Sequence, residues 1–107
     1  MFARMATIKP KNMEERDTVN KFFFEITNHS MYTPILDELM NSPGFVRKEM
    51  VIVDDLNGRV ATSKIIFADQ ENFNNYVNNE VNESMWDYLT VMAEESGLTV
   101  EVKNIEL

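Results

Sequence analysis

The sequence predicts an α+β fold in which an antiparallel sheet carries two helices on one face. A run of apolar and β-branched residues with interleaved charges, 45–53, is followed by Asn57-Gly58 and by a second such run, 60–67. Asn-Gly between two alternating runs is a strong β-hairpin signal, because both residues tolerate the positive φ angles of a type I′ turn. Helical patterns flank the hairpin, and a last alternating run covers 98–103. The order strand, helix, strand, strand, helix, strand is typical of such a sheet.

The first strand has two candidate positions. Residues 19–27 fit two patterns. Helical spacing relates Val19, Phe22, Phe23 and Ile26, and strand alternation relates Phe22, Phe24 and Ile26. Three consecutive phenylalanines favour a strand, because aromatic side chains lose rotamer freedom in a helix. Residues 1–16 are then an N-terminal extension, a short strand and a loop. If 19–27 is helical instead, residues 3–9 become the first strand and the fold class is unchanged.

Both helical patterns have clear ends. The first covers 31–41, with Ser30 as a cap, Pro34 in the first turn and Ser42-Pro43-Gly44 as the stop. The second starts at Asp69, a capping residue, and ends at Gly97. The weak helix formers of 78–83 predict a kink or a break in it. We expect its apolar stripe to face the sheet: Phe73, Tyr76, Val77, Val81, Met85, Tyr88, Leu89 and Met92.

Length and composition narrow the class of protein. At 107 residues the chain is expected to be a single domain, 1–107. A net charge of -8 has the wrong sign for binding a nucleic-acid backbone. Without cysteine there is no disulfide, catalytic thiol or thiolate zinc site. No apolar run is long enough to span a membrane and the amino terminus lacks the core of a secretion signal, so we expect a cytoplasmic protein without membrane contact.

In layout the chain resembles the dimeric α/β-barrel superfamily, ferredoxin-like domains that include antibiotic-biosynthesis monooxygenase-like proteins. Three stretches carry the resemblance: 42–46 closing the first helix, the hairpin with Glu49 and Asp54-Asp55, and 66–73 leading into the second helix. The resemblance implies a homodimer whose two sheets pack face to face around a lumen that binds a small molecule.

The predicted strands give the sheet one apolar and one mixed face. The apolar face is expected to lie under the helices: Val46, Met50, Ile52, Ala61, Ile65, Phe67, Val100 and Val102. The mixed face carries Phe23, Arg47, Glu49, Val51, Val53, Thr62, Lys64, Ile66, Glu101 and Lys103. A solvated face would carry the same charges, but its apolar members favour burial in a dimer around a pocket.

Catalytic candidates are few. His29 is the only histidine, so no histidine-pair metal site can form, and we expect neither a metal nor a cofactor. His29 lies between Asn28 and Ser30, where turn chemistry is the commoner role. Some relatives in the superfamily degrade haem with an Asn, a Trp and a His. Here Trp86 is on a helix and His29 precedes the first helix, so the positions do not match.

The sequence therefore predicts a homodimer that binds a small, largely apolar molecule, fatty-acid-like if it carries an acidic end. The ligand would lie in a cleft between sheet and helices or in the dimer lumen. Arg47 or Lys64 would meet the acidic end, and the wall would consist of Phe23, Tyr32, Ile66 and Trp86. The alternatives are a cofactor-independent monooxygenase that depends on His29 or Trp86, and a structural or regulatory dimer without a ligand.

Overall fold

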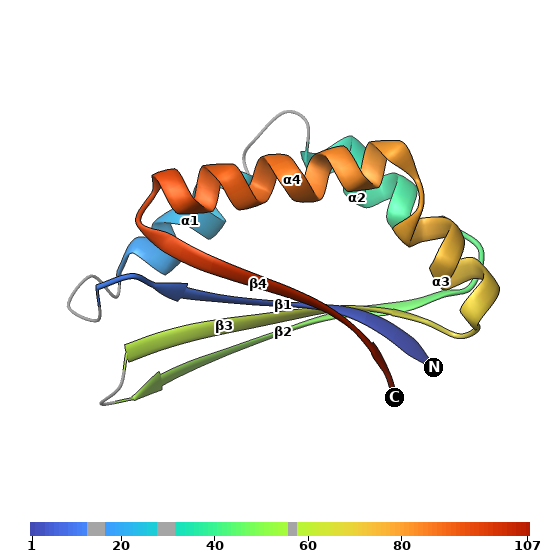
Figure 1. Cartoon of the computed structure of the whole chain (residues 1–107), viewed down its shortest axis with the longest axis horizontal. Coiled ribbons are helices and arrows are strands. Elements are labelled where there is room, and N and C mark those ends of the chain that lie inside the picture. Colours follow the sequence, from blue (N-terminus) through green and yellow to red (C-terminus); the bar gives the residue numbers. More distant parts are fainter. Residues whose placement is uncertain (13–16, 28–31, 56–57) are drawn as a thin grey trace.

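The computed structural model describes residues 1–12, 17–27, 32–55 and 58–107. One antiparallel sheet has the strand order β2-β3-β1-β4. Along the chain the elements are β1 (Phe2–Pro10), α1 (Asp17–Thr27), α2 (Tyr32–Met40), β2 (Phe45–Asp55), β3 (Gly58–Phe67), α3 (Gln70–Val77), α4 (Glu80–Glu95) and β4 (Leu98–Glu106). Figure 1 shows the helices together on one side of the sheet. The predicted fold class is confirmed, with the second predicted helix divided into α3 and α4 and with α1 as an additional helix.

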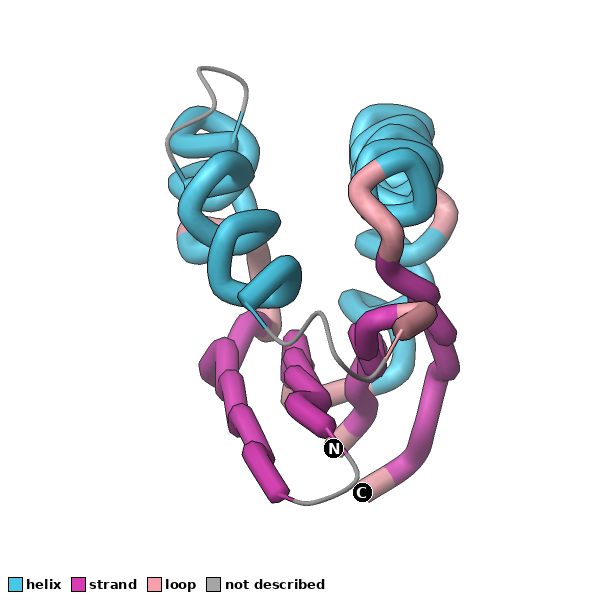
Figure 2. The backbone as a smooth tube through the Cα atoms, turned by 90° about the vertical axis from the view of Figure 1, so that its left-hand side faces the viewer, coloured by secondary structure: helices cyan, strands magenta, loops and turns pink. Residues whose placement is uncertain are grey.

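The helices stand over the sheet in two columns. Figure 2 shows the columns end-on above the strands. In one column α1 contacts β1 and β3, and α2 contacts β2. In the other, α4 contacts β4, while α3 packs on β3 and β1 at one end of the sheet. One column thus includes a contact with the edge strand β2 and the other a contact with the edge strand β4, and the central strands β3 and β1 form a floor between them.

The first strand is Phe2–Pro10, and the expectation of a strand at 19–27 is wrong. Residues 17–27 form α1, whose buried stripe has helical spacing: Val19, Phe22 and Ile26 are 0%, 2% and 5% exposed. Phe24, which a strand would place beside Phe22 and Ile26, is 70% exposed. Burial of one helical stripe outweighs the weak strand preference of the phenylalanines. Far from being an addition, β1 lies between β3 and β4.

The predicted hairpin is present, with its turn one residue earlier than expected. Asp55 pairs with Gly58, so the strands leave only residues 56–57 between them, and these two lie outside the described residues. The predicted sheet faces are kept from Arg47 onward in β2 and through β3, because the alternation of these strands is unchanged. At the start of β2, Phe45 and not Val46 packs with the helix-side cluster, beside the register irregularity between Phe45 and Arg47. Met50 is opposite Ser63 on the helix side, and Glu49 is opposite Lys64 on the open side.

A glycine connects the end of α2 to β2. Gly44 has φ +78°, a left-handed conformation that disfavours side chains. A Cβ atom here would lie 2.7 Å from Asn72 Nδ2 in α3. The carbonyl of Gly44 also accepts a hydrogen bond from the Ala68 amide at 2.8 Å. The predicted stop of the first helix is therefore confirmed and is packed against the start of the second.

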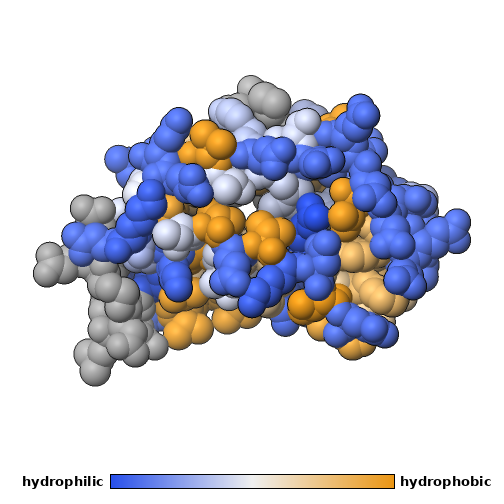
Figure 3. Space-filling view, in the orientation of Figure 1, coloured by the Kyte–Doolittle hydropathy of each residue, from blue (hydrophilic) through white to orange (hydrophobic). Residues whose placement is uncertain are grey.

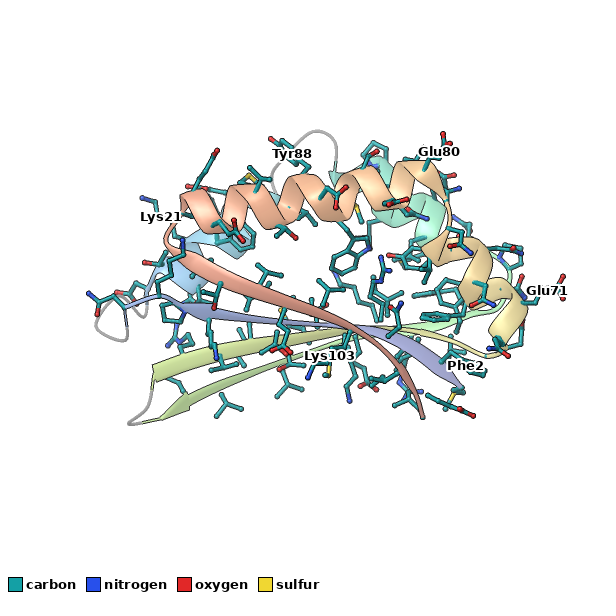
Figure 4. The ribbon with its side chains drawn as sticks, viewed as in Figure 1. Phe2, Lys21, Glu71, Glu80, Tyr88 and Lys103 are labelled. Atoms are coloured by element: carbon teal, nitrogen blue, oxygen red, sulfur yellow. The ribbon has the colours of Figure 1, made fainter. Side chains whose placement is uncertain are left out.

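The break predicted within 78–83 separates α3 from α4. Asp69 caps α3, its Oδ1 accepting a hydrogen bond from the Asn72 amide at 2.9 Å. Asn79 starts α4, its Oδ1 accepting from the amides of Val81 and Asn82. The new start resets the helical phase, so Val81 and Tyr88 are 57% and 47% exposed and do not face the sheet as predicted. Figure 4 shows Tyr88 on the outer side of α4.

The core between sheet and helices is divided into two clusters. One contains Ile8, Val19, Phe22, Ile26, Ala61, Ala93 and Leu98, with Leu89, Met92 and Val100 at its border. The other contains Leu39, Ile65, Phe67, Phe73 and Tyr76, with Phe2, Leu36, Phe45, Val77 and Trp86 at its border. Within the part of the chain that the structure describes, no helix is both long and apolar enough to span a membrane.

Candidate functional site

An apolar cavity of about 80 Å³ lies where the two core clusters meet. A site for one water needs roughly 10–15 Å³ on the same measure, so this cavity has room for a small organic molecule. All four strands and the helices α1, α2 and α4 contribute to it. The lining is Ala6, Ile8, Phe22, Ile26, Ile35, Leu36, Leu39, Lys48, Met50, Ser63, Ile65, Met85, Trp86, Leu89, Thr90 and Val100.

The cavity exists because the floor is made of small side chains. Ala6 on β1 and Ser63 on β3 are direct partners across the sheet. Both point toward the helices, since they share a face with Ile8 and Ile65. Neither side chain is long enough to fill the space between the two helix columns. Figure 3 shows apolar side chains in the band between α4 and the sheet, with hydrophilic residues above them.

Helical spacing directs larger side chains into the same space from above. Phe22 and Ile26 are one turn apart on α1, and Met85 and Leu89 are one turn apart on α4. The positions of the lining residues therefore follow from the side-chain period of each element, which is 2 residues in a strand and 3.6 residues in a helix.

Three polar side chains line the cavity, on its sheet side and on α4. Lys48 lies on β2, half-buried, and is the one ionisable group among the lining residues. Ser63 is 8% exposed, and within the described ranges its hydroxyl forms no hydrogen bond. The Thr90 hydroxyl donates to the Trp86 carbonyl at 2.9 Å, which leaves its oxygen able to accept. No carboxylate lines the cavity in the part of the chain described.

Trp86 connects the cavity wall to a polar group behind it. Its indole Nε1 donates a hydrogen bond of 2.8 Å to the Tyr76 hydroxyl. On its ring lies the Arg4 guanidinium, 5.5 Å from the centroid, and Arg4 Nε also donates to Asn104 Oδ1 at 3.1 Å. Burial raises the pKa of Tyr76 above its ordinary value of 10.0, so its hydroxyl is neutral at physiological pH. These contacts hold the indole in one orientation.

The open face of the sheet has a different chemistry. Arg47 Nε donates to Glu49 Oε1, and Lys103 is 3.0 Å from Glu101 in a second ion pair. The hydrogen bond from Arg47, with the nearby charges of Arg47 and Lys64, lowers the pKa of Glu49 below its ordinary value of 4.5. Val51 and Val53 on this face are 57% and 52% exposed. The open face thus combines paired charges with exposed valines.

The structure separates the residues predicted to bind a ligand. Trp86 lines the cavity, whereas Arg47, Lys64 and Ile66 lie on the open face of the sheet. Phe23 belongs to α1 and not to a strand of that face, and its side chain lies outside the described residues, as does that of Tyr32. His29 lies entirely outside them.

Sequence reasoning missed Lys48 and Ser63. Lys48 is two residues before Met50 on β2, and Ser63 is two residues before Ile65 on β3, so both lie on the helix-side face with these apolar residues. A charged or hydroxyl side chain at a position where strand alternation predicts burial is the sequence signal that could have identified them. Among the described residues no group of three or more acidic or histidine side chains could hold a metal ion.

Comparison with known proteins identifies the fold. No protein-family model matches the chain, and no curated protein matches it either. A dimeric ferredoxin-like protein from an uncultured marine organism matches with a TM-score of 0.67 at 10% identity, over 99% of this chain and 93% of the other. A variant of SnoaB, a cofactor-independent oxygenase from Streptomyces nogalater, matches with a TM-score of 0.59 at 11% identity, over 99% and 91%.

A third match is a monooxygenase from the gene ActVA-Orf6 of Streptomyces coelicolor, solved with the ligand nanaomycin D. Its TM-score is 0.58 at 12% identity, over 99% of this chain and 86% of the other. The predicted resemblance to the dimeric α/β-barrel superfamily is confirmed as a likeness of fold. At these identities the likeness does not extend to function.

Proposed function

We propose that this protein is a homodimer that binds one small, largely apolar molecule per chain in the cavity between the sheet and the helices. The cavity is the observation that carries the proposal. It is lined almost entirely by apolar side chains with a few polar groups among them, which is the usual composition of a small-molecule site. Of the two locations expected from the sequence, the cleft between sheet and helices is favoured over a lumen between sheets.

The open face of the sheet supports the dimer. It presents Val51 and Val53 beside charges of both signs, so a second copy related by a two-fold axis can oppose unlike charges and cover the valines. Two of the matched structures are described as dimeric ferredoxin-like proteins. In this arrangement Arg47 and Lys64 contribute to the contact between subunits and do not reach the ligand.

Native mass spectrometry tests both parts of the proposal. The purified protein is sprayed gently enough to keep the dimer and any molecule carried from the expression host, and is then extracted under denaturing conditions to identify that molecule. We expect a dimer with up to one compound per chain. Loss of that compound in Ala6→Leu, which fills the floor of the cavity, would locate it there; full retention in this variant would contradict the site.

A cofactor-independent monooxygenase is the second candidate, favoured by the position of Trp86. The indole lines the cavity and its N–H group is fixed by Tyr76, as a group that orients an aromatic substrate would be. The reaction would convert a ring methylene to a carbonyl, with dioxygen as oxidant and its second oxygen atom leaving as water. Oxygen uptake with anthrone, abolished in Trp86→Phe and retained in Tyr88→Phe, is the expected result; no uptake removes this candidate.

A further inference from the structure

Asparagine is concentrated in one short part of this protein. Residues 72–82 contain six asparagines, although asparagine is a weak helix former and α3 and α4 cover most of this stretch. N-terminal capping explains only one of them, since Asn79 caps α4 whereas the cap of α3 is Asp69. Four of the six line the same surface cavity: Asn72, Asn75, Asn79 and Asn82.

This polar cavity has a volume of about 190 Å³ and lies between the end of α2 and the junction of α3 with α4. Figure 1 shows these helix segments together over one end of the sheet. One water needs roughly 10–15 Å³ on the same measure, so a molecule of monosaccharide size has room here. The residues described as lining the polar cavity are all different from those lining the apolar cavity, so the two sites are separate.

Hydrogen bonds fix the orientation of three of the lining carboxamides. Asn72 Nδ2 donates to Asp69 Oδ2 at 2.9 Å. Asn82 Nδ2 donates to the Tyr76 carbonyl at 3.4 Å, and Asn79 Oδ1 accepts from two backbone amides in the first turn of α4. Because each contact identifies one end of a carboxamide, the opposite end is also identified. Asn72 and Asn82 therefore have an oxygen left to accept from a ligand, and Asn79 has an NH2 group left to donate.

Acceptors outnumber donors around the polar cavity. Glu38 on α2 adds two carboxylate oxygens, and it is the only charged lining residue in the described ranges. Asn75 adds one oxygen and one NH2 group. No lysine or arginine lines this cavity in the same ranges. A ligand with a negative group would therefore meet a like charge without a compensating cation, which weakens binding.

The ligand has to donate several hydrogen bonds and to accept others. A guanidinium or ammonium group only donates, so it would offer no acceptor to the NH2 groups of Asn75 and Asn79. A hydroxyl group both donates and accepts, so adjacent hydroxyl groups match both kinds of lining group. Pro43 and Phe67 also line the cavity, and their side chains carry no polar atom, which suits the C–H groups of such a molecule.

We propose that the polar cavity binds a neutral, hydroxyl-rich molecule of monosaccharide size. Its hydroxyl groups donate to the Glu38 carboxylate and to the oxygens of Asn72 and Asn82. They accept from the NH2 groups of Asn75 and Asn79. This site goes beyond the proposed function, because it shares no described lining residue with the apolar cavity and does not depend on the ligand of that cavity.

The lining NH2 groups report binding directly in ¹H–¹⁵N NMR spectra of the ¹⁵N-labelled protein. Glucose, ribose, xylitol and myo-inositol are titrated separately at neutral pH, with glucuronate as the anionic and agmatine as the cationic comparison. We expect at least one neutral compound to shift the side-chain signals of Asn75 and Asn79 with a Kd of about 1 mM or tighter. Glucuronate and agmatine should bind at least about 10-fold more weakly than the tightest neutral compound.

Two neighbouring asparagines provide a matched pair of variants. Asn75→Ala removes a lining carboxamide and should weaken the tightest neutral compound about 5-fold, the effect of about one hydrogen bond. Asn74→Ala removes the same side chain from the preceding position, which is exposed and does not line the cavity, and should leave the affinity unchanged. Glu38→Gln keeps the shape of the side chain and removes its charge, so it should strengthen glucuronate binding at least about 5-fold.

Three outcomes would overturn this inference. No shift with any of the four neutral compounds rejects the site. Tighter binding of agmatine than of every neutral compound means that the Glu38 carboxylate selects a cation. Equal weakening by Asn74→Ala and Asn75→Ala means that the compounds contact the exposed surface of α3 and not the polar cavity.

Discussion

The two faces of the sheet arise from the same alternating strands but have opposite chemistry. On the helix side, Ile65 and Phe67 are buried and Lys48 borders an apolar cavity. On the open side, Glu49 pairs with Arg47, and Val51 remains more than half exposed. The difference shows that the alternation of the same strands places paired charges on one face and an apolar cavity on the other.

The largest expected difference between the two faces is in how much an alanine substitution lowers the free energy of unfolding. Phe67→Ala should lower the free energy of unfolding by about 3–5 kcal/mol, because the ring is fully buried and packs on Phe45, Phe73 and Tyr76. Val53→Ala, half exposed on the open face, should cost about 1 kcal/mol. Urea unfolding of both variants measures the difference. Equal losses would mean that the open face contributes to the core as much as the helix side does.

Self-association should depend on the open face alone. Val51→Glu places an unpaired charge in the proposed contact between subunits, and we expect it to weaken the dimer at least about 100-fold. Sedimentation equilibrium measures the change. Val91→Glu, on the equally exposed outer side of α4, is the control and should leave the dimer intact. A dimer that survives Val51→Glu and dissociates in Val91→Glu would assign the interface to the helices.

A smaller loss of stability is expected when the hydrogen bond between Trp86 and Tyr76 is removed. Tyr76→Phe removes the acceptor of the Trp86 N–H group and should cost about 1–3 kcal/mol, because the indole donor is left without its partner. It should also shift the emission maximum of Trp86. Tyr88→Phe, on the exposed side of α4, should change stability by no more than about 0.5 kcal/mol. An unchanged emission spectrum in Tyr76→Phe would show that the hydrogen bond does not orient the indole.

The smallest expected effect is on the stability of the protein at low pH, through Glu49 on the open face. The pKa of Glu49 is lowered in the folded protein, chiefly by the hydrogen bond from Arg47, so its contribution to stability is complete above its ordinary value of 4.5. That contribution is lost as the pH falls from there through the lower folded value. Glu49→Gln should therefore reduce the difference in unfolding midpoint between neutral and acidic buffer. If the difference does not change, the ion pair on this face is not linked to folding.

The sequence predicts more of the fold than of the site. The hairpin, the caps at Asp69 and Gly97 and the break near Asn79 follow from local chemistry, and local chemistry is readable from the sequence. The first strand was misassigned because β1 presents small residues, Ala3 and Ala6, where a strong apolar alternation would have identified it. The burial of those alanines depends on strands and helices distant in sequence, which the local pattern does not contain.

Among the described side chains predicted to bind a ligand, Trp86 lines the cavity, whereas Arg47 and Lys64 lie on the open face of the sheet. Local alternation places each of these residues on a face, but it does not contain the position of a cavity. The cavity arises because small floor residues meet two separated helix columns, and that separation is a property of tertiary structure.

The most direct test of this account is a crystal structure of the protein with an octanol that carries bromine at the far end of its chain. Anomalous scattering locates the bromine independently of the protein atoms. The account predicts bromine in the cavity between sheet and helices, beside Leu89 and Phe22, in each subunit. Bromine between the two sheets, beside Val51 and Thr62, would contradict the assignment of ligand and partner to opposite faces.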